Sequence, residues 1–437
     1  MSWRTILLLG VTALLLSVLL LLEGRRGAGD GATGGRLFSA LEGGAVYQIQ
    51  LSRPEEGSQV RLKRADDGWR MLLPVKDRGD RAQVEALLAG VEFMRPLRWL
   101  PAGDPPSGSG LDKPTIKLIL TSGGGDHELA VGAADASGQG AYVRLEQGGK
   151  VRLAVAPMRL LQLLDLAPGA FRDHLLVPLS PAQIQRVELR GSAGAVTLKR
   201  QGAPGLSWIA EVQGRSCRAS GQRLRRLLNA LSALRGSSIG PATGASAHPW
   251  IQISGAGEKI VILEQAGPCP GRGDQVLLYV QERQGTSAQR TVSACLDQQQ
   301  AALLSPAPGT LQDLALTRWS EPELEEIAIW TPAQDVRLVR TPSGWTRQGK
   351  PFDGLLVRAL SERLQDTQGR LTPRRWEGAA PSARLRLKAE LGGAEELVLF
   401  TGPDGLLFVQ RAGDNADLRL EPDAARPVWD GIQLMGR

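Results

Sequence analysis

Cysteine is scarce in this 437-residue sequence, which contains only Cys217, Cys269 and Cys295. Three cysteines are too few for a disulfide framework or for a zinc site with the usual paired ligands. Cys269 and Cys295 flank an apolar stretch at 275–282 that is typical of a strand. Adjacent strands could bring the two thiols together, which would leave Cys217 unpaired, and the sequence leaves this pairing open.

Histidine is equally rare, and the motifs of common enzymes are missing. His127, His174 and His248 lie far apart, and none has a His or Cys at metal-ligand spacing. No G-x-S-x-G nucleophile elbow occurs. The glycine run at 121–126 lacks the Gly-Lys-Ser/Thr ending of a phosphate-binding loop and is typical of a hairpin. We therefore predict no catalytic residue, no cofactor site and no metal site.

Aromatic residues make up only 4% of the chain, but hydrophobic residues reach 42%, which is enough for packed cores. The length allows two to four domains. There are 52 basic and 45 acidic residues, giving a net charge of +7. A basic surface favours anionic lipid or polymer as a partner. Nucleic acid is not expected, because no aromatic base-stacking pattern accompanies the charge.

One long apolar run is present, at the amino terminus. Residues 6–22 carry no charge, and as a helix they would span about 26 Å, close to the hydrocarbon thickness of a bilayer. No small-x-small cleavage site follows, so an anchor is favoured over a signal peptide. Residues 1–22 are therefore predicted to be a transmembrane anchor and 23–45 a Gly-rich linker with an apolar patch at 37–41. This predicts a single-pass inner-membrane protein with its globular part in the periplasm.

Internal repetition organises the rest of the chain. The stretch at 171–190 recurs 140 residues later at 311–330, so that Asp173 matches Asp313 and Ser180 matches Ser320. Each copy is a joint at which one module ends and the next begins.

Each module has the same order of elements. Two apolar strands lead to a tryptophan, then to a helix cap, then to a helix with an apolar stripe beginning four residues after the cap. The tryptophans are Trp69, Trp208 and Trp345, and the caps are Asp80, Ser220 and Asp353. A strand-rich meander follows each helix. The sequence thus predicts an α+β class with module 1 at 46–178, module 2 at 179–319 and module 3 at 320–437.

Four segments resemble a bacterial domain-of-unknown-function family, DUF4340. They are GLDKPTIKLIL (110–120), LAVG (129–132), YVRL (142–145) and FRDHLLVPL (171–179). The resemblance covers about residues 46–190 and is weaker in the later copies, which lack the Gly-Leu-x-x-Pro element. It implies a single N-terminal anchor and an accessory role beside ABC transporters of the gliding-motility type, and it supplies no catalytic residues.

The remaining candidates have both structural and functional interpretations. The repeated tryptophans could be a sugar-stacking platform, but their shared module position favours a core role. The acids Glu321, Glu323, Glu325 and Glu326 are typical of a solvated turn, and both Arg-Gly-Asp tripeptides, at 78–80 and 272–274, are interpreted as structural turns. The richest basic run comprises Arg215, Arg218, Arg223, Arg225 and Arg226, of which Arg225 and Arg226 are predicted to face outward.

Taken together, these features favour a non-enzymatic structural or adaptor subunit of a membrane transport or motility complex. The expected contacts are the inner membrane, through residues 6–22, and other subunits of that complex. The first alternative is a binding module for cell-wall polymer or anionic envelope lipid, and a more distant one is an enzyme. A concave Arg-lined groove would favour ligand binding, and converging titratable groups would favour an enzyme.

Overall fold

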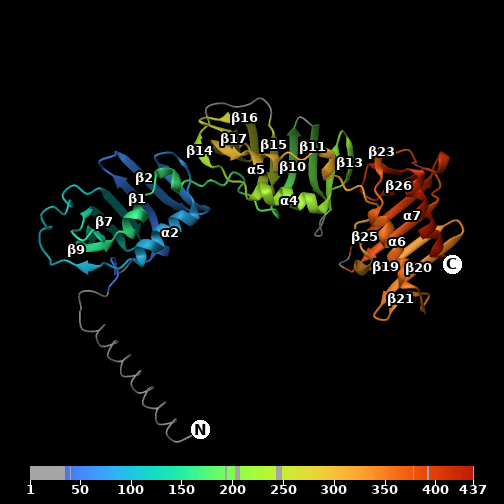
Figure 1. Ribbon diagram of the computed structural model, residues 1–437, viewed down its shortest axis with the longest axis horizontal. Coiled ribbons are helices and arrows are strands. Elements are labelled where there is room, and N and C mark those ends of the chain that lie inside the picture. Colours follow the sequence, from blue (N-terminus) through green and yellow to red (C-terminus); the bar gives the residue numbers. More distant parts are fainter. Residues whose placement is uncertain are drawn as a thin grey trace, which may run out of the picture. The chain divides into compact units, whose positions relative to one another are not determined.

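Three tandem sheet modules make up the computed structural model (Figure 1). The structure describes residues 35–39, 41–191, 194–201, 207–242, 249–376, 378–390 and 393–436. The chain divides into two compact units, the first ending at His174 and the second beginning at Leu175. Unit 1 contains module 1, and unit 2 contains modules 2 and 3.

Each module is one nine-stranded antiparallel sheet. In module 1 the strand order is β4-β3-β2-β1-β6-β7-β8-β9-β5. The strands are β1 (Val46–Arg53), β2 (Ser58–Ala65), β3 (Gly68–Leu73), β4 (Asp77–Arg78), β5 (Arg98–Trp99), β6 (Ile116–Ser122), β7 (Gly125–Ala134), β8 (Gly140–Gln147) and β9 (Lys150–Pro157). The helices are α2 (Arg81–Glu92), α3 (Arg159–Leu164) and the 3-10 turns η1 (Gly43–Ala45) and η2 (Pro168–Phe171).

Module 2 repeats this order as β13-β12-β11-β10-β15-β16-β17-β18-β14. The strands are β10 (Ile184–Gly191), β11 (Gly194–Gln201), β12 (Ser207–Val212), β13 (Arg215–Arg218), β14 (Ser238–Pro241), β15 (Ile251–Gly255), β16 (Lys259–Cys269), β17 (Arg272–Gln284) and β18 (Ser287–Asp297). The helices are α4 (Gly221–Ser232), α5 (Gln298–Leu303), η3 (Ala256–Glu258) and η4 (Pro308–Leu311).

Module 3 has the order β22-β21-β20-β19-β24-β25-β26-β27-β23. The strands are β19 (Leu324–Thr331), β20 (Gln334–Thr341), β21 (Gly344–Arg347), β22 (Lys350–Pro351), β23 (Arg370–Pro373), β24 (Ala383–Ala389), β25 (Ala394–Thr401), β26 (Leu407–Arg411) and β27 (Ala416–Leu420). The helices are α6 (Gly354–Asp366), α7 (Pro422–Leu434), η5 (Glu321–Glu323) and η6 (Pro403–Gly405).

The predicted α+β class is wrong, because the sheet dominates every module. The strand pair before the helix and the meander after it are not separate layers. They join edge to edge through β1 and β6 in module 1, and through the matching strands in the other two modules, into one continuous sheet. Each module adds to this sheet only one long helix of 12 or 13 residues and a second helix of 6 or 13. The protein is therefore mainly antiparallel β.

The predicted inner-membrane location is also corrected. Among the described residues, no helix is both long enough and apolar enough to cross a membrane. The anchor predicted at residues 6–22 lies outside the described part of the chain.

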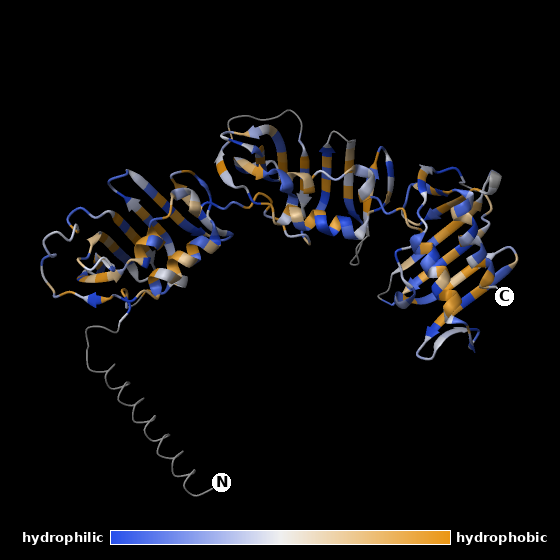
Figure 2. Cartoon of the chain, viewed as in Figure 1, coloured by the Kyte–Doolittle hydropathy of each residue, from blue (hydrophilic) through white to orange (hydrophobic). Residues whose placement is uncertain are grey.

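Alternation along the strands explains why one face of each sheet is buried. Strand β24 alternates strictly between buried and exposed residues, and Figure 2 shows such alternation as bands of hydrophobic and hydrophilic colour. The buried side chains share a core with the apolar stripe of the long helix. All the predicted stripe positions are buried, including Ser361, whose hydroxyl donates to the carbonyl oxygen of Trp319.

The three repeated tryptophans belong to these cores, as predicted. Trp69, Trp208 and Trp345 are each 4% exposed. Each pairs across the sheet with an arginine, and each accepts a backbone hydrogen bond from the residue before the helix cap. The core interpretation is therefore confirmed.

The three helix caps differ in chemistry. Oδ1 of Asp80 accepts from the backbone N–H of Gln83 at 3.0 Å, and Oδ1 of Asp353 accepts from Leu355 at 2.9 Å. Ser220 occupies the matching position but makes no capping bond with its side chain. The predicted cap position of Ser220 is therefore confirmed, although its side chain does not supply the capping bond.

We expect the caps to differ in stability as well. Asp353→Ala should lower the free energy of unfolding of module 3 by about 0.5–2 kcal/mol, because one N–H at the helix start loses its partner. Ser220→Ala serves as the matched control and should change little. Hydrogen exchange of the amides in α4 and α6 measures both effects. A loss of protection in Ser220→Ala equal to that in Asp353→Ala would contradict this interpretation.

The segments that precede the first strand of each module contact the same part of their module. The backbone N–H groups of Leu37, Leu176 and Leu316 all donate to a carbonyl at the end of the long helix of the module that they enter. All three leucines are fully buried. The apolar patch at 37–41, which the sequence placed in the linker, is therefore part of the first core.

Candidate functional site: the charged junction of modules 2 and 3

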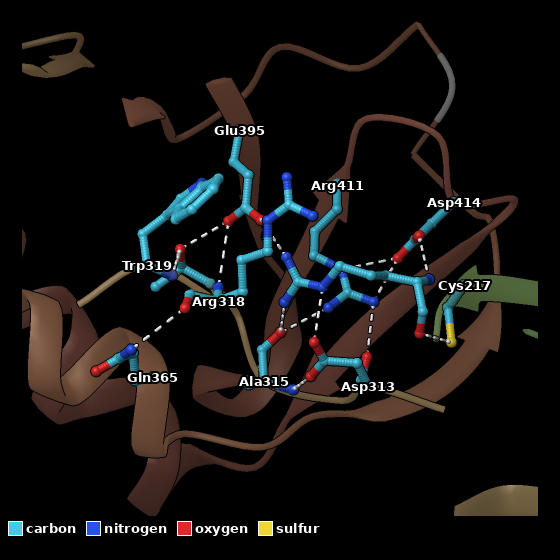
Figure 3. Close-up of polar contacts among 11 residues, drawn as sticks. Cys217, Asp313, Ala315, Arg318, Trp319, Gln365, Glu395, Arg411 and Asp414 are labelled. Carbon is cyan, nitrogen blue, oxygen red and sulfur yellow. Dashed lines mark hydrogen bonds and ion pairs between the residues drawn. The ribbon is translucent and has the colours of Figure 1, made fainter. Parts of the chain in front are cut away.

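Charged side chains gather where module 2 meets module 3 (Figure 3). Arginines at positions 218, 318 and 411 meet carboxylates at positions 313, 395 and 414. Arg218 ends the edge strand β13 of module 2, and Asp313 lies in the joint. Glu395 lies at the start of β25, Arg318 lies in the joint before module 3, Arg411 ends β26, and Asp414 lies in the turn after it. The three positive and three negative charges are balanced.

Arg218 is the centre of this cluster. Its Nε lies 2.7 Å from Oδ2 of Asp313, one terminal nitrogen pairs with Glu395, and the other donates to the carbonyl of Ala315 at 3.3 Å. Burial alone would lower the pKa of Arg218, but the carboxylates of Glu395 and Asp313 outweigh burial and raise it. The guanidinium therefore stays charged although it is largely buried.

Arg411 and Asp414 form a second buried pair, with 2.6 Å between the terminal guanidinium nitrogen and the carboxylate. Arg411 also donates to the carbonyls of Asp313 at 2.9 Å and Ala315 at 2.6 Å. Burial raises the pKa of Asp414, and Arg411 opposes that effect. Arg411 thus holds the joint segment against module 3.

The backbone of β13 is also bound by module 3. The N–H of Arg218 donates to Oδ1 of Asp414 at 2.9 Å, and the N–H of Ser216 donates to Oδ1 of Asn415 at 2.6 Å. The N–H of Asn415 returns a bond to the carbonyl of Ser216 at 3.0 Å. A strand at the edge of a sheet exposes unpaired polar groups that attract other chains. Module 3 satisfies three of these groups on β13.

Module 1 contains an ion pair equivalent to the one between Arg218 and Asp313. Arg78 matches Arg218 and Asp173 matches Asp313, and their charged atoms lie 3.1 Å apart. The N–H of Asp173 donates to the carbonyl of Arg78, as that of Asp313 does to Arg218. The repeat of Asp173 and Asp313 was visible in the sequence. The repeat of an arginine two residues before the helix cap was a further signal that sequence analysis missed.

A polar cavity of about 190 Å³ adjoins the junction, bordered by Trp208, Arg218, Arg318, Glu395 and Asp414. The charged groups around it already pair with one another. The site therefore fixes two modules against each other, and its charges are used for that contact.

Cys217 lies beside the junction and is buried. Burial, with a contribution from Asp414, raises the pKa of its thiol to about 12. At pH 8 only about one thiol in ten thousand is then a thiolate, the form that reacts with electrophiles.

We therefore expect Cys217 to resist alkylation in the native chain. Maleimide labelling followed by mass spectrometry should show no modification until denaturant is added. Arg218→Ala should accelerate the labelling, because it opens the junction. Rapid modification of Cys217 in the unaltered native protein would contradict the buried placement.

The other cysteines are joined, since Cys269 and Cys295 form a disulfide with 5.7 Å between their Cα atoms. The pairing that the sequence left open is therefore present.

The two histidines that the structure describes, His127 and His174, have separate partners. His127 is buried, with its Nε2 3.3 Å from the hydroxyl of Ser122 and its ring edge-on to Phe38. Burial lowers the pKa of His127, and Asp126 opposes that effect. His174 is half-buried in the first joint, with its Nε2 3.4 Å from the carbonyl of Gly169, and His248 lies outside the described residues. Among the described residues, no group of three metal-ligating side chains occurs.

The acids at 321–326 each have a separate structural partner. Glu321 accepts from the indole N–H of Trp345 at 2.6 Å, and Glu323 forms a capping box with Ser320. Glu325 pairs with Lys388 and Glu326 with Arg337. The hydrogen bond from Ser320 is the main cause that lowers the pKa of Glu323.

The remaining sequence candidates separate in the structure. Glycines 123–125 form the hairpin between β6 and β7. In the first Arg-Gly-Asp tripeptide, Arg78 belongs to the joint and Asp80 is the cap, whereas the second opens β17.

The basic run also divides. Arg218 is buried in the junction, and Arg215 and Arg223 donate to the carbonyls of Leu371 and Thr310. Arg225 and Arg226 face outward on α4, as predicted.

Comparison with known proteins gives one match. Residues 108–249 match the family model described as domain of unknown function (DUF4340), which covers the later strands of module 1 and the first strands and long helix of module 2. No curated protein and no solved structure matches the chain. The matched region begins two residues before the Gly-Leu-x-x-Pro segment at 110–114 and includes the first joint. This part of the chain is therefore similar to the DUF4340 family.

Proposed function

We propose that this protein is a non-enzymatic structural adaptor, in which modules 2 and 3 present a fixed surface to other proteins. The observation that carries the proposal is the junction itself. Its six charged side chains pair with one another across two modules, and module 3 binds the edge of the sheet of module 2. Buried ion pairs are a poor source of net stability but impose a specific geometry when all members are satisfied.

The two outermost modules also differ from the junction pattern. Pro351 occupies the place of Arg218 in module 3, so this edge has neither the guanidinium nor a backbone donor at that position. In module 1, the position equivalent to Glu395 is occupied by His127. Glu395 pairs with Leu387 in the sheet of module 3, and His127 pairs with the equivalent leucine, Leu120, in module 1. The charged contact between modules 2 and 3 is therefore not repeated at these two positions.

The family resemblance supplies the setting. It implies an accessory role beside ABC transporters of the gliding-motility type, and an adaptor with two modules fixed against each other suits a subunit of such a transport or motility complex. This assignment rests on association, because the chemistry of the junction does not name a partner.

Co-purification tests the adaptor proposal. The full chain carrying an affinity tag should recover stoichiometric partner proteins from cells after mild cross-linking. Arg218→Ala should reduce that recovery, because the surface shared by modules 2 and 3 is no longer fixed. Arg225→Ala, an exposed arginine of the same module, is the matched control and should recover the same partners. A chain that purifies without partners in every form would overturn the proposal.

A second candidate function, binding of an anionic polymer, has one specific observation in its favour. The outward face of α4 carries Arg225 and Arg226, and the helix contains no acidic residue. By comparison, α2 and α6 each form an internal Arg–Glu pair. Charge reversal by Arg225→Glu with Arg226→Glu should abolish retention on an immobilised anionic cell-wall polymer if this function holds. Unchanged retention would exclude this face.

A further inference from the structure

Module 2 contains a cavity of about 520 Å³ at the end of its first hairpin. This volume falls within the range of about 300–1,000 Å³ that is usual for small-ligand sites. Gly191 ends strand β10 at one side of the cavity, and Leu304 and Pro306 follow helix α5 at another. Trp250 supplies an aromatic wall, and Arg190 also borders the cavity.

In module 1 an arginine side chain occupies the matching place. Arg53 ends strand β1, is only 6% exposed, and turns its guanidinium toward the segment that follows α3. One terminal nitrogen donates to the carbonyls of Leu164 at 2.8 Å and Leu166 at 2.7 Å. The Nε lies 3.4 Å from the carboxylate of Asp165, which is largely exposed. The two carbonyls are therefore the principal partners of this guanidinium.

Sheet register makes Gly191 the counterpart of Arg53. Each is the last paired residue of the first strand, since Arg53 pairs with Ser58 and Gly191 pairs with Gly194. The 140-residue repeat likewise matches Leu164 with Leu304 and Leu166 with Pro306. Module 2 therefore keeps the carbonyl cage but lacks the side chain that fills it in module 1.

Module 3 fills the same place in another way. Thr331 stands at the position of Arg53, and its hydroxyl accepts from the N–H of Gln334 at 3.1 Å. The side chain of Gln334 then donates to the carbonyl of Ile432 in α7 at 3.1 Å. In both filled modules, a side chain of the first hairpin thus donates to carbonyls of the last helix or the segment after it. Module 2 is the exception.

The empty cage has a defined chemistry. Among the backbone hydrogen bonds of the described turns and loops, none ends on the carbonyl of Leu304 or Pro306. Both residues border the cavity, so a ligand that donates hydrogen bonds would find acceptors there. An indole face also attracts a planar cation. Arg190 is half exposed and lies 3.5 Å from Glu188, which offsets its charge. Ser305 replaces the carboxylate of Asp165 and offers a neutral acceptor.

We propose that the cavity of module 2 binds a guanidinium group from outside the module, in the place that Arg53 occupies in module 1. The group belongs either to a small molecule or to an arginine side chain of a partner protein. In both cases its N–H groups donate to the carbonyls of Leu304 and Pro306, and its plane lies against Trp250.

Calorimetric titration of the full chain with two probes distinguishes the sources. Agmatine carries a free guanidinium, and acetyl-Gly-Arg-Gly-amide carries the same group within a peptide. Saturable binding of one equivalent of either probe is expected, and butylamine, which lacks the guanidinium, should bind much more weakly. Binding of the peptide favours a partner protein, whereas binding of agmatine alone favours a small molecule. If neither probe binds saturably up to millimolar concentration, the proposal is overturned.

Two variants test the location. Gly191→Arg should abolish binding by filling the cavity, and a Cβ added at Gly191 meets nothing within 4 Å. Gly273→Arg adds the same charge on β17 of the same module, where a Cβ also meets nothing, and should leave binding unchanged. Independently, Arg53→Ala should open the matching cavity in module 1 and raise the number of agmatine sites from one to two. Binding that survives Gly191→Arg, or a site number that stays at one in Arg53→Ala, would overturn the proposal.

Discussion

Replacement of Arg218 by alanine should destabilise the junction of modules 2 and 3 by about 3–5 kcal/mol. The variant leaves the carboxylates of Glu395 and Asp313 facing each other without their shared cation. Removal of one partner of a buried pair is far more damaging than the net value of that pair, because the remaining charge stays desolvated. The N–H of Arg218 still bonds to Asp414 in the variant, so the expected loss arises from the side chain.

Hydrogen exchange measures this effect segment by segment, which suits a chain whose modules need not unfold together. Amides in β13 and β25 should lose protection, whereas those in β1 and β6 should not. Arg337→Ala is the matched control, because Arg337 also pairs with a glutamate but lies on the exposed face of β20. It should change protection very little, since exposed ion pairs contribute little stability.

A double replacement strengthens the test. Arg218→Ala combined with Glu395→Ala should destabilise less than the sum of the two single variants, because the second change removes a carboxylate that the first leaves without one of its two arginine partners. Strict additivity would show that the two side chains are not coupled and would contradict the ion pair between Arg218 and Glu395.

Periodicity predicted the parts of the fold that repeat. The apolar stripes of the long helices and the tryptophans were correctly placed, because burial on one face imposes a spacing that is visible in a single sequence. The same signal missed the edge strands, since β4 and β22 have only two residues each and such lengths carry no period. It also gave no account of how strands join. The pairing of β1 with β6 depends on residues about 70 apart in sequence, as in Leu51 and Leu118.

The charged junction of modules 2 and 3 could not be predicted from the sequence. Arg218 and Glu395 are 177 residues apart, and neither stands in a pattern that marks a charged contact. In the sequence, Arg218 is one member of a basic run. In the structure it is buried among carboxylates, whereas Arg225 and Arg226 are exposed. The cavity beside Gly191 was equally hidden. The strand register is needed to recognise it, because the register shows that Gly191 in module 2 is equivalent to Arg53 in module 1.

Alanine in place of Trp69, Trp208 or Trp345 should lower the stability of the affected module by about 3–5 kcal/mol. Each indole is 4% exposed and packs in the core shared by the first strands and the long helix. Trp345→Ala should have the largest effect, since it also leaves Glu321 without the indole N–H that it accepts at 2.6 Å. Hydrogen exchange should show the loss within one module each time, because stacked repeats contact chiefly their neighbours.

Trp330 provides the matched control for these variants. It lies on β19 of module 3, only fifteen residues before Trp345, but is 41% exposed. Trp330→Ala should therefore change the stability of module 3 far less than Trp345→Ala, although both remove the same side chain. The sugar-platform interpretation requires the opposite, with unfolding unaffected by loss of the repeated tryptophans and binding of saccharide lost. Native-like melting of all three repeated-tryptophan variants would therefore contradict the shared position that defines the modules.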